Sequence, residues 1–477
     1  MDTLKLGQNW TPVAQSEAGS RVMTKPETPT DWFGMGPLPP KSKRTTLAYR
    51  TLVLFSFVYF VRPEDFIPGL SYLYLARILG GITLLALIFG VKRSERGKIP
   101  LEGKILIALL VQMLLCIPTA FWRGGSYDIV VNRFSKGVIV ALLIPLVVTG
   151  VKELRRLLFI QAAAITLMTF ASIIAHHTMD GRLMGIQKGI LENPNDLAIN
   201  IAINFPLCMG FFFAAKKGLP KLLWGAGLFC ILYGVVATYS RSGMIAMTIT
   251  GLICLWEFGV RGRRPLLLAS TAICGVLALG ALVANPRYLH RIASLVVAPD
   301  PGVLGTGTME SHGEASLQAR TELLKDSLRM MAKHPIFGVG PGMFPAVTGA
   351  WRVVHNTYTE LGAEAGIPAL ILFLALLITA GRRIRRVKKL PGYAADPDIR
   401  LWTSALWAGL AGYAAGAVTA STEYTLFPYF LVGYICALYQ IASKPVEKTS
   451  ENSPSNHGNG NEPGYVGNTE RELAWTR

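Results

Sequence analysis

Residues 365–380 read AGIPALILFLALLITA, and residues 382–389 read RRIRRVKK. A helix over residues 357–380 would be long enough to cross a hydrocarbon core of about 30 Å. Clusters of Arg and Lys directly beyond an apolar helix are typical of the cytoplasmic side of a membrane. The two stretches therefore predict a membrane-spanning helix whose C-terminal end faces the cytoplasm.

Similar apolar runs recur along most of the 477-residue chain. Apolar residues make up 51% and charged residues 16% of the sequence, against roughly 25% charged residues in a typical soluble domain. This composition excludes soluble, disordered, collagen-like and disulfide-scaffold proteins, and continuous runs differ from the alternating strands of a membrane β-barrel. We expect an all-α, polytopic helical membrane protein with about twelve transmembrane helices. The predicted spans are 46–61, 70–91, 103–121, 134–150, 155–175, 196–215, 220–239, 243–259, 265–284, 357–380, 401–420 and 426–442.

Basic residues exceed acidic ones, 47 against 29, and the formal net charge is +18. When the connections between the predicted spans are assigned alternately to two sides, about two thirds of the basic residues fall on one side. The positive-inside rule places that side, with both termini, in the cytoplasm. We therefore expect the charge excess to set the topology and to attract membrane lipid phosphates, and we expect no nucleic-acid partner.

The predicted organisation has five parts. They are a largely disordered cytoplasmic arm (1–45), nine transmembrane helices (46–284), a long periplasmic loop (285–356), three further transmembrane helices (357–443) and a disordered cytoplasmic tail (444–477). Inside the long loop, apolar positions at helical spacing predict an amphipathic helix on the membrane surface, which ends before Pro335. Those positions are Leu317, Thr321, Leu324, Leu328 and Met331. The following stretch, HPIFGVGPGMF at residues 334–344, has three glycines that allow close approach to another backbone or a ligand.

Four polar clusters lie on the predicted periplasmic side. They are Arg182 with Asn195 and Asp196 before the sixth span, Arg241 in the turn 239–243, Arg320 on the amphipathic helix, and His355, Asn356 and Tyr358 with Glu360 and Glu364 at the tenth span. Taken singly, each has a plainer structural explanation, such as a helix cap at Asn195 or Asp196, or an interfacial arginine at Arg241. Together, arginines and a histidine facing one compartment suit an anionic phosphate substrate and a proton acceptor.

The same clusters, in this order, resemble the O-antigen ligase and polymerase family over about residues 180–380. The matching stretches are Arg182 to Asn195-Asp196-Leu197-Ala198, Ser240-Arg241-Ser242-Gly243, Arg320 followed by residues 334–340, and His355-Asn356-Thr357-Tyr358 with Glu364-Ala365-Gly366-Ile367. The resemblance implies a multi-span glycosyltransferase of the bacterial inner membrane that acts in cell-surface polysaccharide or lipopolysaccharide biosynthesis. Such enzymes take glycan from undecaprenyl diphosphate on the periplasmic face and pass it to a lipid A core, a growing polysaccharide or a protein hydroxyl.

The expected chemistry needs neither a cofactor nor a metal. Arg241 and Arg320 are expected to neutralise the charge that develops on the leaving diphosphate, with Arg182 as a third contact. His355 is the expected general base for the acceptor hydroxyl, and direct attack predicts inversion at the anomeric carbon. We expect Asn195, Asn356, Tyr358 and Glu364 to bind substrate or to hold the surroundings of the base. The six cysteines fall within predicted spans and form no CxxC pair, so no thiolate metal site is expected.

Two other classes of function are open at this point. A transporter for an anionic solute would place Arg241 and His355 along a permeation path, and helices broken near mid-membrane would favour it. A scaffold for polysaccharide assembly proteins would leave the arginines and the histidine without a role. The sequence does not separate ligase from polymerase, since the two share a donor and differ in the acceptor.

Overall fold

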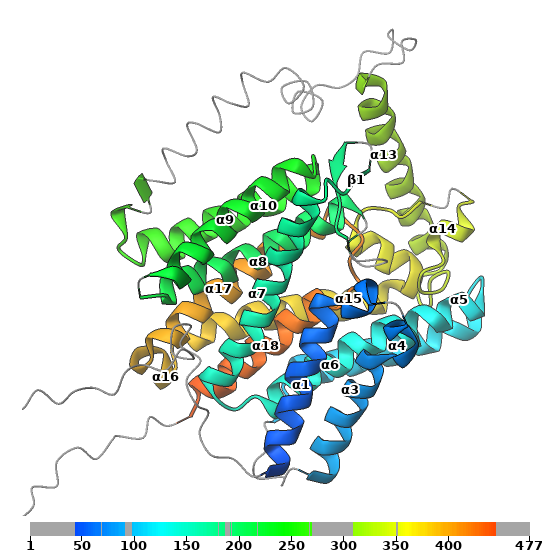
Figure 1. The fold of residues 1–477 in the computed structure, drawn as a ribbon. Coiled ribbons are helices and arrows are strands. Elements are labelled where there is room, and N and C mark those ends of the chain that lie inside the picture. The colour runs from blue at the N-terminus through cyan, green and yellow to red at the C-terminus, as the bar shows by residue number, and fades with distance from the viewer. Residues whose placement is uncertain are drawn as a thin grey trace, which may run out of the picture.

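The computed structural model describes residues 43–67, 69–90, 98–179, 181–186, 191, 193–216, 218–266, 268–269, 309–349 and 352–444 (Figure 1). The first half contains α1 (Lys43–Val61), α2 (Pro63–Phe66), η2 (Leu70–Leu73), α3 (Leu75–Leu85), η3 (Ala86–Gly90), α4 (Leu101–Cys116), η5 (Ile117–Thr119), α5 (Arg123–Tyr127), η6 (Asp128–Phe134), α6 (Ser135–Val147), α7 (Val151–Ile174), β1 (Thr178–Met179) and β2 (Arg182–Leu183). The second half contains α8 (Pro194–Ala214), α9 (Leu219–Ala237), α10 (Arg241–Cys254), η7 (Leu255–Val260), α13 (Met309–Lys333), α14 (Phe344–Val347), α15 (Thr357–Val387), α16 (Pro391–Ala395), α17 (Pro397–Gly416) and α18 (Phe427–Ala442).

The predicted helical membrane protein is confirmed. Among the described residues, seven helices are long and apolar enough to cross a membrane: Leu101–Thr119, Arg123–Val147, Val151–Ile174, Pro194–Ala214, Leu219–Ala237, Arg241–Val260 and Thr357–Val387. Shorter apolar helices cover Thr46–Val61, Leu75–Phe89 and Phe427–Ala442. The predicted ninth span, 265–284, lies almost wholly outside the described residues, as do most of the arm and the tail, and the count of twelve stays a prediction.

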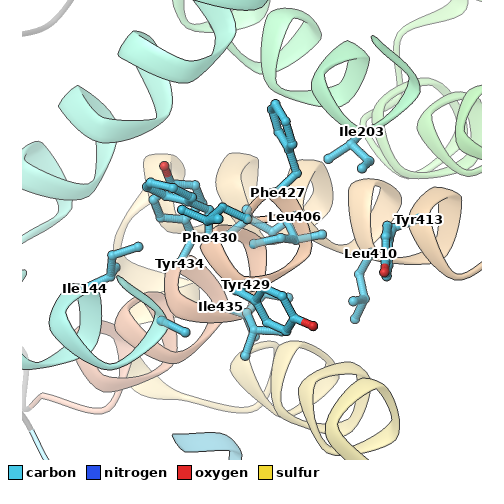
Figure 2. Packing of buried hydrophobic residues seen from close by; sticks show 14 of the residues in the cluster. Ile144, Ile203, Leu406, Leu410, Tyr413, Phe427, Tyr429, Phe430, Tyr434 and Ile435 are labelled. Carbon is cyan, nitrogen blue, oxygen red and sulfur yellow. The ribbon is translucent and has the colours of Figure 1, made fainter. Parts of the chain in front are cut away.

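The centre of the bundle is formed by α8, α17 and α18. In the most apolar stretch of α8, 78% of the residues are buried inside the protein. Large side chains such as Tyr434 and Phe430 fill the space between the helices (Figure 2). Helices approach closely where a glycine faces a bulky side chain, as Gly210 does with Trp402, which is typical of helix packing in membranes.

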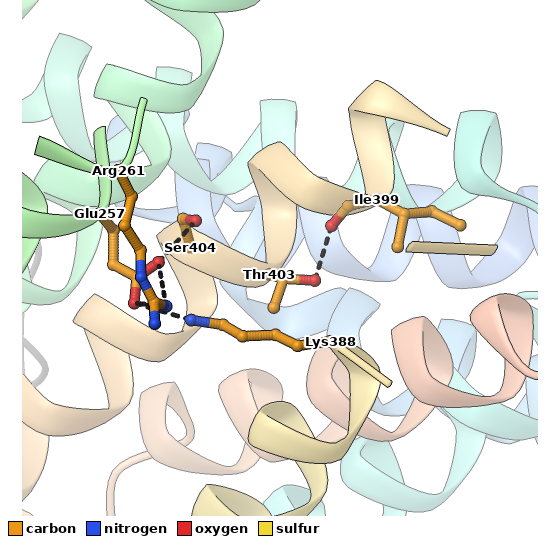
Figure 3. Close-up of polar contacts among 6 residues, drawn as sticks. All are labelled: Glu257, Arg261, Lys388, Ile399, Thr403 and Ser404. Carbon is orange, nitrogen blue, oxygen red and sulfur yellow. Dashed lines mark hydrogen bonds and ion pairs between the residues drawn. The ribbon is translucent and has the colours of Figure 1, made fainter. Parts of the chain in front are cut away.

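At the predicted cytoplasmic end, buried carboxylates connect the helices. Glu257 accepts hydrogen bonds from Lys388 at 2.8 Å, Arg261 at 3.1 Å and Ser404 at 3.3 Å, so that η7, α15 and α17 are joined at one point (Figure 3). Arg383 contacts the buried Glu102 at 2.7 Å in the same way. Several members of the predicted cytoplasmic basic clusters therefore also hold the bundle together.

The amphipathic helix predicted over 317–331 is present as α13, which lies against α15 beside the bundle (Figure 1). Its buried face carries Leu323 and Ser327, whereas Leu328 is 44% exposed. The predicted apolar stripe is therefore largely not the face that packs on the protein, although Met331 reaches Gly362 of α15. Among the described residues of the predicted stripe, Leu328 is the exposed apolar side chain, and the position of the helix on the membrane surface stays a prediction.

Helix α15 is broken at Gly366, whose φ is 82°. The stretch 334–344 fills the break: Val339 N–H donates to the Ala363 carbonyl at 2.9 Å, and Gly340 N–H to that of Glu364 at 2.9 Å. Gly338 lies so close to the Glu364 carbonyl that a Cβ there would overlap it. The glycines of the stretch 334–344 thus allow close contact with the backbone of α15, as expected. This contact also fixes the segment that leads towards His355.

Candidate functional site

A cavity of about 450 Å³ lies where the β1–β2 hairpin, the start of α8, α13 and the segment before α15 meet. Its walls are Met179, Arg182, Asn193, Pro194, Asn195, Ala319, Arg320, Leu323, Arg352 and His355. Three of the four clusters singled out in the sequence thus contribute to one cavity, and all of its cationic side chains are arginines. A hollow of this size with three arginines and several apolar side chains in its walls suits a phosphorylated ligand that also carries apolar groups.

Arg182 is fixed from two directions. Its Nε donates to the Thr238 carbonyl at 3.0 Å, and its Nη2 donates to Asn195 Oδ1 at 3.0 Å. The same Asn195 oxygen accepts the Ser240 hydroxyl at 2.7 Å. The side chain of Ser240 also caps α10 by accepting from Gly243 N–H at 3.1 Å. Asn195 therefore orients Arg182 and joins the two clusters at one wall of the cavity.

The helix cap at α8 differs from the expected one. Asn193, rather than Asn195 or Asp196, is the N-cap residue, and its side chain accepts from Asn195 N–H at 2.8 Å. The helix begins two residues earlier than the predicted span because Pro194 occupies its first position, where proline is favoured. This shift leaves the side chain of Asn195 available to hold Arg182.

Arg241 begins α10 directly after its cap and does not line the described cavity. It acts on the site through its charge. The pKa of Arg320 is lowered, chiefly by burial and further by the charge of Arg241. Arginines that oppose one another in this way are stabilised when an anion lies between them.

His355 occupies the end of the segment that precedes α15. Its backbone is left-handed, with φ at 60°, and its N–H donates to Ser421 Oγ at 3.1 Å. Burial, and then the charges of Arg320, Arg182 and Arg352, lower the pKa of the imidazole from 6.5 to about 4. The ring is consequently neutral at neutral pH, in the state that can accept a proton.

The other predicted residues near the tenth span hold the backbone of the site. Asn356 caps α15 by accepting from Tyr358 N–H at 3.0 Å and Thr359 N–H at 3.2 Å. The Tyr358 hydroxyl donates to the Ala414 carbonyl at 2.8 Å. These side chains do not line the described cavity, and their direct contact with substrate stays a prediction.

Glu364 holds the glycine-rich stretch in place. Its carboxylate accepts from Gly342 N–H at 2.7 Å, Phe344 N–H at 3.0 Å and the Tyr424 hydroxyl at 2.6 Å. The side chain is fully buried. Glu364 therefore supports the residues beneath the cavity, and no atom of it reaches the cavity walls.

Two features of the site were not expected from the sequence. Arg352 lines the cavity three residues before His355, and only its position in the long loop could have drawn attention to it. Glu423 and Ser421, between α17 and α18, approach Glu360 and Glu364 beneath the site. The carboxylates of Glu360, Glu364 and Glu423 converge within 4.8 Å and form the group of described residues best suited to hold a metal ion.

Comparison with known proteins identifies one family. Residues 226–374 match the family model described as O-antigen ligase, which confirms the resemblance seen in the motifs. The matched region contains Arg241, Arg320 and His355. Separately, 126 residues are 29% identical to the virion DNA-directed RNA polymerase of Enterobacteria phage N4, over 26% of this chain and 3% of that protein. So small a share of the phage protein carries nothing about its activity to this chain.

Proposed function

We propose that this chain, which is similar to the O-antigen ligase family over residues 226–374, is a membrane glycosyltransferase that uses undecaprenyl-diphosphate-linked glycan on the periplasmic face. The observation that supports this most is the cavity in which Arg182, Arg320 and Arg352 surround His355. It combines binding groups for a diphosphate with a neutral proton acceptor in one hollow.

The arginines bind the donor diphosphate and stabilise its departure. When the bond between the anomeric carbon and the phosphate oxygen breaks, the electron pair moves to the diphosphate, whose negative charge increases. Guanidinium groups fixed in advance, as Arg182 is by Asn195, stabilise this charge without reorganisation. A paired N–H···O geometry is available to each arginine, so the transfer proceeds without a metal ion at the reacting phosphates.

His355 accepts the proton of the attacking hydroxyl. With only the protein's own groups around it, its pKa of about 4 makes it a weak base. A bound diphosphate cancels much of the charge of Arg320 and Arg352, and the pKa rises towards the value that suits general base catalysis. The base is therefore activated by the donor, which limits reaction with water before the donor binds. A single displacement by the acceptor oxygen inverts the anomeric carbon.

The protein would work in the bacterial inner membrane with both termini in the cytoplasm. The acceptor is a hydroxyl of a lipid A core, a growing polysaccharide or a protein, and polysaccharide assembly proteins are the expected partners. Membrane lipids would contact the apolar helices and the side of α13 that carries Leu328. The cavity walls carry no feature that separates ligase from polymerase.

A transporter explains the observations less well. The break at Gly366 resembles the broken helices of transporters, but its backbone groups bond to the stretch 334–344 and to Gln112, whose amide donates to the Ala365 carbonyl at 3.2 Å. None of residues 363–367 lines the described cavity. The break therefore serves packing.

The test is transfer by the purified protein in liposomes that contain undecaprenyl-diphosphate oligosaccharide and a hydroxyl acceptor. We expect product with the inverted anomeric configuration and release of undecaprenyl diphosphate. Arg320→Gln and His355→Gln should each reduce transfer by at least about 100-fold. The matched controls are Arg329→Gln, which is exposed on the same helix, and His334→Gln, which is exposed before the glycine-rich stretch. Movement of intact donor across the bilayer without transfer would favour the transporter.

A further inference from the structure

Three buried carboxylates converge beneath the cavity. Glu360 and Glu364 lie on successive turns of α15, and Glu423 comes from the connection between α17 and α18. One oxygen atom of each lies within 4.8 Å of the others. Their exposed fractions are 2%, 0% and 2%. Two segments of the chain, α15 and the connection between α17 and α18, thus place three acidic groups at one enclosed point.

The three carboxylates differ in how well they are satisfied. Glu364 accepts three hydrogen bonds, as described above, and Glu360 accepts the hydroxyl of Ser421. Glu423 is 2% exposed, and its Oε2 atom is buried without a hydrogen-bond donor from any described residue. An unsatisfied carboxylate oxygen inside a protein is costly and indicates a group that is missing from the protein alone.

Charge balance supports the same conclusion. The cationic side chains that form ion pairs with buried glutamates elsewhere, such as Arg383 with Glu102 and Lys388 with Glu257, have no counterpart here. Within the described part of the chain, no Lys, Arg or His side chain forms an ion pair with any of the three carboxylates. Three ionised carboxylates this close together would repel each other strongly unless protons or a cation neutralise them.

We propose that Glu360, Glu364 and Glu423 bind a hard divalent cation of the Ca²⁺ type. Carboxylate oxygens are the ligands that such cations prefer, and oxygens on a sphere of about 2.4 Å radius lie at most about 4.8 Å apart. Mg²⁺ fits less well because it retains several waters, and the three side chains are enclosed. The site is distinct from the arginine-lined cavity, so the cation does not touch the reacting phosphates.

The cation would position the site. It joins the first turns of α15 to the connection that contains Ser421, whose hydroxyl accepts the His355 N–H at 3.1 Å. Through Glu364 it also joins the turn at Gly342 and Phe344. The backbone around His355 would therefore be held by one ion. This inference does not depend on the proposed transfer activity.

Cation binding can be tested on the full chain purified in detergent and stripped with a chelator. Ca²⁺ at millimolar concentration should raise the unfolding midpoint by about 5 °C. Tb³⁺, a luminescent substitute for Ca²⁺, should emit on excitation of the neighbouring Tyr424, and Ca²⁺ should displace it. Glu423→Gln should lower the apparent affinity for both ions at least about tenfold.

Glu102→Gln is the matched control, because Glu102 is equally buried but paired with Arg383. This variant should unfold at a lower temperature and keep the full increase on addition of Ca²⁺. The proposal fails if Ca²⁺ raises the midpoint of Glu423→Gln as much as that of the unchanged chain. It also fails if Glu423→Gln is more stable than the unchanged chain in Ca²⁺, since the three carboxylates would then repel each other without a bound cation to offset their charge.

Discussion

Replacing Arg320 with Gln should raise the pKa of His355. The surrounding protein lowers this pKa from 6.5 to about 4, by burial first and by Arg320 second. At 1.36 kcal/mol per unit, protonation of the ring costs about 3 kcal/mol more than in water. Removal of the Arg320 charge, the largest of the three arginine contributions, should recover about one pKa unit, and Arg352→Gln should recover less.

The direct assay is NMR titration of the His355 imidazole in detergent, with His334→Gln to simplify assignment. The acidic limb of the pH profile of kcat/KM reports the pKa of the base in the free enzyme. Its midpoint should therefore lie near pH 4, and in Arg320→Gln it should rise by as much as the pKa of His355 does. The limb of kcat should lie at higher pH, because the donor diphosphate is then bound. Arg329→Gln should leave all these values unchanged. A pKa that stays at 4 in Arg320→Gln would refute the electrostatic account of the base.

Three further predictions concern the scaffold. Gly366→Ala should prevent stable folding, because the positive φ and the adjacent carbonyl oxygen leave no room for a Cβ. Gly381→Ala, in the regular part of the same helix, should be tolerated. Fluorescence-detected gel filtration compares the two variants. Ser240→Ala removes a helix cap and should cost about 1–2 kcal/mol in thermal unfolding, while Thr should restore most of it. Lys388→Met leaves Glu257 with weaker pairing and should lower the unfolding midpoint without changing the pH profile of transfer.

Stability should also depend on pH through His355. Its folded-state pKa lies below the value expected in the unfolded chain, so the unfolded state binds the proton more readily. The free energy of unfolding should consequently fall as the pH drops from about 6.5 towards 4. Arg320→Gln, which raises the folded-state pKa, should reduce this loss.

The sequence predicted the features that depend on local pattern and composition. Apolar length predicted the helices, and helical spacing predicted α13. Arg182, Arg320 and His355, which the sequence places on the predicted outer side, were singled out because charged residues near lipid are costly, and all three line the cavity. The sequence did not predict which face of α13 packs against the bundle. Leu323 and Ser327 are buried there, whereas Leu328 is exposed. Spacing alone identifies a stripe without saying whether protein or lipid covers it.

The features that the sequence did not predict depend on contacts between distant segments. Gly366 and Gly381 look alike in the same helix, yet only Gly366 has a positive φ, because the stretch 334–344 inserts beside it. The cap of α8 was missed for a local reason instead: Pro194 takes the first position of the helix, which makes Asn193 the cap rather than Asn195 or Asp196. Glu423 lies in a short connection that shows no motif. Its significance depends on two glutamates more than 50 residues earlier in the chain.

The site has two layers: an upper layer that lines the cavity, and a lower layer that contains Ser421 and supports the backbone of His355. The upper layer holds arginines that oppose one another and lower the pKa of the base when no anion is present. Without rigid supports the guanidinium groups would move away from one another, because like charges repel. Asn195 prevents this for Arg182, and the segment before α15 carries Arg352 and His355 on a backbone held from below by Ser421. The rigid lower layer therefore holds the arginines close together in spite of their mutual repulsion. The proposed diphosphate would relieve this repulsion on binding, and the arginines would not have to rearrange.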